Sequence, residues 1–327
     1  MDADVIIVGA GLSGLVAAHQ LLDAGKSVII VDKGRSVGGR LATRRIQNGR
    51  ADHGAQFFTV RTDAFQAQVD TWLAKDLVYV WGRGWSDGSV QKTKPDGYPR
   101  YATRQGMNYL ARDLAENVPD IRVSTRIESI QWQNDSWQLT DTDGQSLSSN
   151  ILIMTAPVPQ TLVLLENVPL GEEDRKALQK IDYGPCLCGL FVVEGEVNLP
   201  EPGARQNFED TVYWIADNKA KGISPDERVI TLHADADFSR ANYDAPPEEN
   251  LAVFRAELEK YLVEGASITE EQLKKWRYSI PQTMHPDDVL QASNLPLICA
   301  GDAFGGRARV EGAFLSGLEA GKRAIAL

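Results

Sequence analysis

Two apolar segments near the start of the chain flank a glycine-rich turn and an amphipathic stretch. Val5 to Val8 is a short, mostly β-branched run, the pattern of a buried parallel strand. Residues 15–22 then repeat apolar side chains at the spacing of a helix. A second apolar run extends from Val28 to Val31. The pattern predicts a strand–helix–strand unit.

Further apolar patterns predict an α/β protein along the rest of the chain. Helices are expected over residues 102–118 and 251–264, the second with apolar side chains at helical spacing. Short strands are expected at residues 121–123, 126–130, 137–140, 150–157, 191–193, 212–215, 229–233 and 297–300.

The turn after the first strand contains three glycines at a spacing that suits a nucleotide. Gly9 permits a tight turn, Gly11 lets the backbone approach a pyrophosphate, and Gly14 lets the helix pack on the strand. The helix start at Leu12 faces the phosphates, and Asp32, at the end of the second strand, can accept from a ribose hydroxyl. The unit predicts dinucleotide binding; a glycine-rich turn in an ordinary α/β protein is the alternative.

The net charge of the chain limits the classes of binding partner that are expected. The chain has 45 acidic and 34 basic side chains, a formal charge of −11, and nucleic acids and anionic membranes both prefer a basic face. No apolar run reaches the roughly 18 residues that span a bilayer. The acidic start, Met1-Asp2-Ala3-Asp4, lacks the basic beginning of a secretory signal. We expect a cytoplasmic protein without a nucleic-acid or membrane partner.

Cysteine and histidine give no sign of a metal site. The chain has three cysteines, Cys186, Cys188 and Cys299, and four histidines without metal-ligand spacing. Cys186 and Cys188 would share one face of a strand. We expect buried, reduced thiols and no metal.

The loop after Asp32 bears on which dinucleotide binds. Lys33 begins a segment with Gly39 and Arg40, where glycine lets the backbone crowd a phosphate and arginine offers a forked, charged donor. This resembles the Gly-Gly-Arg segment of the flavin amine oxidase superfamily, whose arginine reaches the FAD pyrophosphate region. The superfamily usually has Glu where this chain has Asp32, a shorter side chain in the same role. A charged surface loop is the alternative.

The far end of the chain is also similar to that superfamily. An apolar strand at 297–300 leads into Gly301-Asp302, and residues 309–317 begin the last helix. The resemblance implies that Asp302 binds the ribityl chain, that the helix start at Val310 points at the flavin, and that the main chain of Ile127 contacts the adenine end. FAD is expected to be non-covalent, because no cysteine or histidine is placed to bond it.

Cofactor motifs at both ends of the chain imply a discontinuous domain. We expect a Rossmann-type FAD-binding domain made of residues 1–60, 100–160 and 290–327. A mixed α+β substrate domain is expected from residues 61–99 and 161–289.

Several segments resemble one family within the superfamily, the renalases, and specifically the bacterial type. Residues 52–61, Asp-His-Gly-Ala-Gln-Phe-Phe-Thr-Val-Arg, are similar to a renalase segment, as are residues 213–219, 232–240 and 276–278. The resemblance implies an FAD oxidase of mis-reduced NAD(P) isomers, which carry the hydride at carbon 2 or 6 of the ring. NAD(P)+ is the product, and O2 is reduced to H2O2.

The resemblance also implies site residues. Gln56 and Phe57 would contact the flavin ring, and the substrate side would be lined by Phe57, Phe58, Thr59, Arg61, Cys186 and Ala303. Arg100 and Tyr101 could edge the same pocket. The two phenylalanines could instead be core aromatics and Arg61 a solvated loop charge. The roles of His233 and Glu311 stay open, and Trp276 and Tyr278 are core residues or pocket walls.

No side chain stands out as a general base, nucleophile or metal ligand, so we expect no catalytic residue besides flavin N5. A dihydropyridine is already a strong hydride donor and needs only stacking and orientation. A small-amine oxidase is one alternative, although no lysine lies in a strand context that suits a lysine–water relay. An isoprenoid desaturase and a non-catalytic FAD-binding protein are the others.

Overall fold

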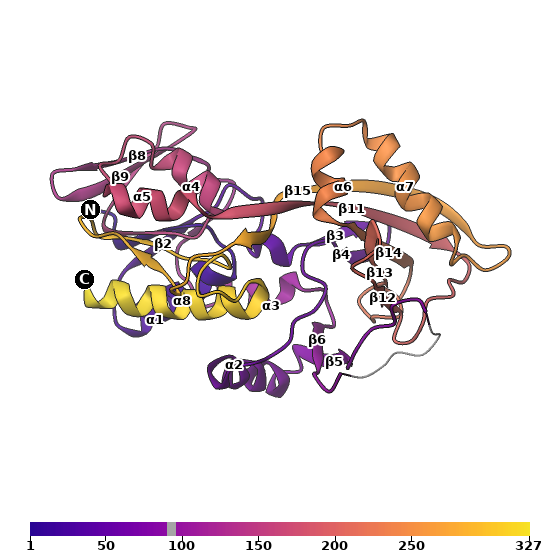
Figure 1. Ribbon diagram of the computed structural model, residues 1–327. Helices are drawn as coiled ribbons and strands as arrows, with labels where there is room; N and C mark the ends of the chain where they lie inside the picture. The colour runs from indigo at the N-terminus through magenta and orange to yellow at the C-terminus, as the bar shows by residue number, and fades with distance from the viewer. Residues whose placement is uncertain (90–95) are drawn as a thin grey trace. The chain divides into compact units, whose positions relative to one another are not determined.

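The computed structural model describes residues 1–89 and 96–327, and the chain forms two compact units (Figure 1). The first unit consists of Met1–Arg40, Leu110–Asp182 and Pro281–Leu327; the second consists of Leu41–Tyr109 and Tyr183–Ile280. Residues 90–95, which belong to the expected 61–99 segment, lie outside the described residues. Each unit is built around its own sheet.

The first unit contains an eight-stranded, mostly parallel sheet, which confirms the predicted α/β fold. Five neighbouring strands run parallel in the order β17-β10-β1-β2-β7, and β16 pairs antiparallel to β17. The hairpin of β8 and β9 joins the sheet through β10. The strands are β1 (Ala3–Val8), β2 (Val28–Val31), β7 (Ile121–Arg122), β8 (Ile127–Gln133), β9 (Ser136–Asp141), β10 (Ser146–Met154), β16 (Leu290–Gln291) and β17 (Leu297–Cys299).

The helices of this unit lie on two sides of the sheet. Figure 1 shows α1 and α8 side by side on one side and α4 and α5 on the other. The helical segments are α1 (Leu12–Asp23), the 3-10 turn η1 (Gly39–Leu41, at the unit boundary), α3 (Asn108–Ala115, which crosses the boundary), α4 (Val158–Leu164), α5 (Glu172–Gln179) and α8 (Arg309–Ala326). Glycines permit the close packing of α1 and α8: a Cβ atom at Gly317 would lie 2.5 Å from the Ser13 carbonyl oxygen.

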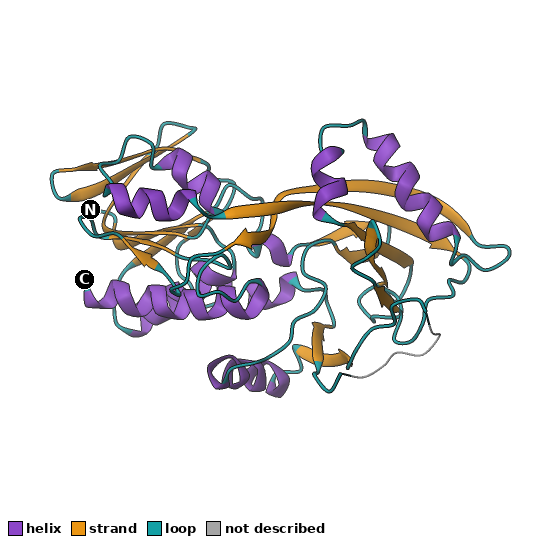
Figure 2. Ribbon diagram, in the orientation of Figure 1, coloured by secondary structure: helices purple, strands orange, loops and turns teal. Residues whose placement is uncertain are grey.

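The second unit contains a five-stranded sheet in the order β12-β13-β14-β11-β15, with two small hairpins, β3–β4 and β5–β6 (Figure 2). Alternate residues of β11 face opposite layers: Phe191 packs with Phe254 of α7, and Leu190 packs with Ile46 of β3. The elements are β3 (Thr43–Ile46), β4 (Gly49–Asp52), α2 (Asp63–Ala74), β5 (Val78–Gly82), β6 (Arg100–Thr103), β11 (Asp182–Glu194), β12 (Ala204–Gln206), β13 (Val212–Asp217), β14 (Arg228–Ala234), α6 (Ala236–Ala241), α7 (Pro247–Glu259) and β15 (Ser267–Thr283).

Two predicted helices have different bounds. The helix expected from residue 102 begins only at Asn108, because Arg100–Thr103 pairs with β5 and Gly106, at φ +93°, turns the chain. The helix expected to reach residue 264 ends at Glu259. Residues 41–60, grouped above with the FAD-binding segments, pack in the second unit, because Ile46 and Ala51 belong to the core around β11 and β14.

In the part of the chain that the structure describes, no helix is both long and apolar enough to cross a membrane.

Candidate functional site

The carboxyl ends of β1, β2 and β10 meet at one edge of the first unit. The Gly9 N–H donates to the Val31 carbonyl at 2.8 Å, and the Thr155 N–H donates to the Val8 carbonyl at 2.9 Å. Thr155 Oγ1 lies 3.0 Å from the Gly9 carbonyl oxygen. In open α/β sheets, ligands bind in the crevice outside these strand ends.

The three glycines of the first turn differ in what surrounds them. Gly9 has φ +120°, and a Cβ atom there would lie 2.4 Å from Thr155 Oγ1; at Gly14 it would lie 2.1 Å from the Gly9 carbonyl oxygen. At Gly11 it would meet no protein atom within 4 Å. Gly9 and Gly14 are therefore required by the fold, whereas Gly11 leaves bare backbone open to a ligand.

The Gly-Gly-Arg segment lies beside this open backbone. The Gly38 N–H donates to the Ala10 carbonyl at 2.8 Å, and the Cβ position of Gly39 lies 3.7 Å from the Gly11 Cα. The two glycine segments thus form one surface in the first unit.

Asp32 ties the loops of this edge together. Its carboxylate accepts from the Ala10 N–H at 2.7 Å and the Gly34 N–H at 2.6 Å. Its carbonyl accepts from the Thr125 N–H at 2.8 Å, which brings the chain before Ile127 to the same edge. Lys33 Nζ donates to Gln160 at 2.7 Å.

Arg40 and Asp302, from opposite ends of the chain, form a bidentate ion pair with N–O distances of 2.6 and 2.7 Å. Burial raises the pKa of the Asp302 carboxyl, and the Arg40 guanidinium opposes that shift. The sequence analysis assigned both residues to the cofactor, and the structure brings them together.

The N-termini of α1, whose N-cap is Gly11, and of α8, whose N-cap is Ala308, have no side-chain cap, and the same holds for α4 and α5. Val310 and Glu311 are buried in the first turn of α8. Free N–H groups and the helix dipole favour negative charge. Together with the open backbone at Gly11, these ends fit a pyrophosphate-bearing cofactor such as FAD.

The second unit gathers an aromatic cluster, which we define as Phe57, Trp81, Trp85 and Trp214. The Phe57 ring lies 5.0 Å from Trp85 and 5.5 Å from Trp214, centroid to centroid. The Arg100 guanidinium lies 5.9 Å from the Phe57 ring and 5.7 Å from Trp85, and two hydrogen bonds join it to Asp96. Those bonds lower the pKa of Asp96 to about 2.

Phe58 and Arg61 have different surroundings. Phe58 is 3% exposed and packs against Tyr101, Phe65 and Trp72, so most of its surface is taken up by the core. Arg61 is exposed, with its guanidinium 3.6 Å from the Tyr98 ring centroid.

The remaining predicted lining residues lie in separate places. Thr59 is half-buried. Cys186 is buried in β11, and burial raises the pKa of its thiol to about 12. Ala303 is fully buried in the first unit, where its carbonyl accepts from the His285 N–H at 2.8 Å.

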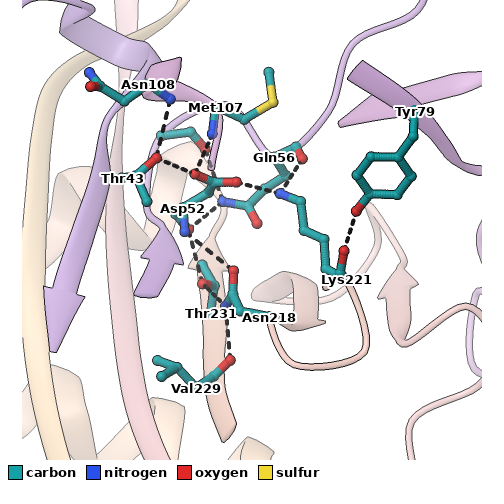
Figure 3. A network of polar contacts seen from close by, with 11 residues as sticks. Thr43, Asp52, Gln56, Tyr79, Met107, Asn108, Asn218, Lys221, Val229 and Thr231 are labelled. Carbon is teal, nitrogen blue, oxygen red and sulfur yellow. Dashed lines mark hydrogen bonds and ion pairs between the residues drawn. The ribbon is translucent and has the colours of Figure 1, made fainter. Parts of the chain in front are cut away.

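Asp52 is the centre of a buried polar network in the second unit (Figure 3). Its Oδ2 lies 2.5 Å from Nζ of Lys221, and neither side chain is exposed to solvent. Its Oδ1 accepts from Thr43 Oγ1 at 2.6 Å and from the Met107 N–H at 2.8 Å. Burial lowers the pKa of Lys221, and Asp52 opposes that shift.

The network also holds Gln56. The side-chain Nε2 of Gln56 donates to the main-chain carbonyl of Asp52 at 2.7 Å, and the main-chain carbonyl of Gln56 accepts from Lys221 Nζ at 2.6 Å. Asn218 and Thr231 complete the network: Asn218 Nδ2 donates to Thr231 Oγ1 at 2.9 Å, and Thr231 Oγ1 donates to the Asp52 carbonyl at 2.9 Å.

Two histidines lie near this network. Burial lowers the pKa of His53 to about 4 and that of His233 to about 3, so both rings are neutral at pH 7. His53 stacks on Trp276, whose Nε1 donates to the His53 carbonyl at 2.7 Å. Trp276 thus packs against the segment that carries Gln56 and Phe57.

Lys221 is the residue that the sequence analysis missed. The sequence shows no lysine in a strand context that suits a relay, and Lys221 lies in the turn after β13. Its partner Asp52 is 169 residues away in the chain, so no local sequence signal links the two.

Comparisons with known proteins agree with this architecture. Residues 7–70 match the NAD(P)-binding Rossmann-like domain, and residues 70–325 match the flavin containing amine oxidoreductase family. The chain is similar to renalase of Mus musculus, at 22% identity over 324 residues that cover 92% of each chain.

Solved structures share the fold at low sequence identity. A provisionally assigned protoporphyrinogen oxidase from Exiguobacterium sp. 255-15 has a TM-score of 0.78 at 12% identity, covering 98% of each chain. Cyclohexylamine oxidase from Brevibacterium oxydans IH-35A has a TM-score of 0.71 at 13% identity, covering 100% of this chain and 99% of that one. Because the match over residues 70–325 spans more than half of the sequence, the chain belongs to the flavin containing amine oxidoreductase family and is an FAD-dependent oxidoreductase.

Proposed function

We propose that this protein is a renalase of the bacterial type: an oxidase that removes a hydride from 2- or 6-dihydro isomers of NAD(P), releases NAD(P)+ and reduces O2 to H2O2. The similarity to mouse renalase over 92% of both chains supports this assignment. FAD, when bound, supplies the hydride acceptor and the reaction with O2.

The cofactor is assigned to residues of both units. In the first unit they are Gly9, Gly11, Leu12, Gly14, Asp32, Lys33, Gly39, Arg40, Ile127, Asp302 and Val310. In the second unit, Gln56 and Phe57 are assigned to the flavin ring. The open backbone at Gly11 and the uncapped starts of α1 and α8 support a pyrophosphate in the first unit.

The choice of substrate rests on the aromatic cluster, because cationic side chains of the protein itself contact its ring faces. Arg100 lies over Phe57 and Trp85, and Lys221 Nζ lies 4.8 Å from the Trp81 ring centroid. An amine substrate would need such ring faces for its ammonium group, and these two cations compete for them. Both cations are paired with carboxylates, Arg100 with Asp96 and Lys221 with Asp52, so the cluster suits the flat, neutral ring of a dihydronicotinamide.

The titratable groups of the second unit also suit hydride transfer without proton abstraction. The lowered pKa values of His53 and His233 make both rings weak bases, and the Cys186 thiol is protonated at pH 7. The protein's contribution is therefore to bind and orient the substrate. We assign the substrate lining to Phe57, Phe58, Thr59, Arg61, Cys186 and Ala303, and Phe58 also anchors the segment in the core.

The test is anaerobic stopped-flow of the FAD-loaded protein against 2- and 6-dihydro-NAD(P), ordinary NADH and a panel of small amines. Rapid bleaching of the flavin band by a 2- or 6-dihydro isomer is expected, with NAD(P)+ as product and H2O2 after air is admitted. Bleaching by amines alone would establish an amine oxidase instead. If none of these reductants bleaches the flavin, the proposed enzymatic activity is refuted.

A further inference from the structure

The buried ion pair of Asp52 and Lys221 is costly, which raises the question of what it does. Both side chains are fully buried, and their N–O distance is 2.5 Å. Removing two charges from water costs several kcal/mol per ion, and apolar residues of similar volume often replace such pairs without loss of stability. Stability alone is therefore a weak reason for this pair.

The pair is bonded directly to the segment that carries Gln56. Lys221 Nζ donates to the main-chain carbonyl of Gln56 at 2.6 Å, and the main-chain carbonyl of Asp52 accepts from Gln56 Nε2 at 2.7 Å. The ion pair therefore holds the main chain of Gln56, and the main chain of Asp52 holds its side chain (Figure 3).

One oxygen atom of the Gln56 side chain, Oε1, remains available as an acceptor. Nε2 also donates to the Gly54 carbonyl at 3.1 Å, and two carbonyl partners fix which end of the amide is the nitrogen. Oε1 is buried and has no hydrogen-bond partner in the described residues. A buried, unpaired acceptor is unfavourable unless a ligand donates to it.

The same segment carries the ring of the aromatic cluster. Phe57 follows Gln56 directly, so the peptide whose oxygen Lys221 binds is the one that leads into Phe57. The Lys221 Nζ also lies over Trp81, another member of the cluster.

We propose that Asp52 and Lys221 are a positioning pair that fixes the peptide between Gln56 and Phe57, and through it the Gln56 side chain and the Phe57 ring, for cofactor and substrate. The inference rests on the proposed function in taking Gln56 and Phe57 as contacts of the flavin and the dihydronicotinamide. The pair itself acts through the Gln56–Phe57 segment.

Two double variants separate positioning from stability and from charge. Asp52→Asn with Lys221→Met removes both charges and leaves the Gln56 carbonyl without its donor. Asp52→Asn with Lys221→Gln also removes both charges but keeps an N–H donor that can reach toward the Gln56 carbonyl, on a side chain one atom shorter. Neither variant leaves an unpaired ion in the core, so both are expected to fold.

The first readout is FAD affinity of the apoprotein, measured by quenching of flavin fluorescence. The Met variant is expected to raise the Kd about tenfold, as for the loss of one hydrogen bond to a buried group. The Gln variant is expected to stay within about threefold of the parent. The second readout is kcat/KM for the dihydronicotinamide, where a misplaced ring costs on the order of tenfold to a hundredfold.

Arg255→Met is the matched control, because it breaks a half-exposed ion pair with Glu271 (2.5 Å) in the same unit. It is expected to leave both readouts unchanged. Wild-type values for the Met variant, or equal losses in the two double variants, would overturn positioning by a hydrogen bond. Gln56→Ala and Phe57→Leu test the underlying site. If these two variants also leave FAD affinity and kcat/KM unchanged, Gln56 and Phe57 are not contacts of the cofactor or the substrate. If only these two variants impair FAD affinity or kcat/KM, the contacts stand and the positioning pair is refuted.

Discussion

At the scale of single residues, two buried carboxylates are paired with cations that lie far away in the sequence. Arg40 pairs with Asp302, and Lys221 pairs with Asp52. Both pairs bury carboxylates that would otherwise protonate or destabilise the fold, since an isolated buried charge is strongly unfavourable. Replacing one partner is therefore expected to affect both the ligand and the residue left behind.

Arg40→Ala is expected to weaken FAD binding by about 1.5–3 kcal/mol, the range for a lost hydrogen bond to a charged group. It also leaves the Asp302 carboxyl, whose pKa burial already raises, without its guanidinium. Titration of the apoprotein with FAD measures the effect. Arg35→Ala, an exposed arginine of the same loop, is the control. Equal affinities for the two variants would refute the role of Arg40.

The two buried histidines predict loss of stability in mild acid. In the unfolded chain a histidine protonates near pH 6.5, whereas burial holds the pKa of His53 at about 4 and that of His233 at about 3. The unfolded state therefore binds more protons below pH 6.5, and the free energy of unfolding falls as the pH drops from about 6.5 toward 4. Thermal melts between pH 4 and 7.5 measure this, and His233→Gln should flatten the curve. An unchanged slope would contradict the assignment.

At the scale of elements, the contact of α1 and α8 fixes the positions of the two helix starts within the first unit. Both helices begin at the edge where the glycine turn and Asp302 lie, and both N-termini lack a side-chain cap. Glycine and alanine on the facing sides let the helices approach closely: a Cβ atom at Gly321 would lie 2.5 Å from the Gln20 Cβ. Any added bulk there moves one helix start relative to the other.

Gly317→Val is expected to lower the melting temperature and to weaken FAD binding together, because its Cβ would meet Ser13 and Val16 of α1. Overpacking of this kind costs about 1–3 kcal/mol. Lys322→Val, on the exposed side of the same helix, should change neither quantity. A Gly317 variant that melts and binds like the parent would show that the helices can separate without cost.

At the scale of the whole molecule, the two units have separate cores and contain different features of the proposed function. The first provides the parallel sheet and the nucleotide edge, and the second provides the aromatic cluster and the buried network. A ligand that binds only the folded chain stabilises it by mass action.

FAD is expected to bind without a covalent bond, and heat or acid denaturation should release it into the supernatant. At a free concentration of about 100 times the Kd, it should stabilise the fold by roughly 2.7 kcal/mol, visible as a higher melting temperature of the reconstituted apoprotein. Absorbance of the supernatant after precipitation is the direct measurement. A yellow pellet would show a flavin bonded to the chain.

The sequence predicted what is local and missed what is distant. The glycine turn, its flanking strands and Asp32 lie within one strand–helix–strand unit, so spacing alone predicts their geometry. Strand β15 (Ser267–Thr283) escaped prediction because its residues are mostly polar and half-buried, and apolar side chains alternate only over the short stretch from Trp276 to Ile280. The Asp52–Lys221 pair could not be found because local spacing carries no information about residues 169 positions apart.

The separation of Arg40 and Asp302 by 262 positions in the sequence also has a consequence during synthesis. At about 5–20 residues per second, the ribosome needs on the order of tens of seconds to make the second partner after the first. For that interval the nascent chain presents an α1 without α8 and an Arg40 without its partner Asp302. Cofactor loading is therefore expected to wait for the end of translation. Ribosome-bound chains that stop before Asp302 should fail to retain FAD, which flavin fluorescence of purified stalled complexes would reveal.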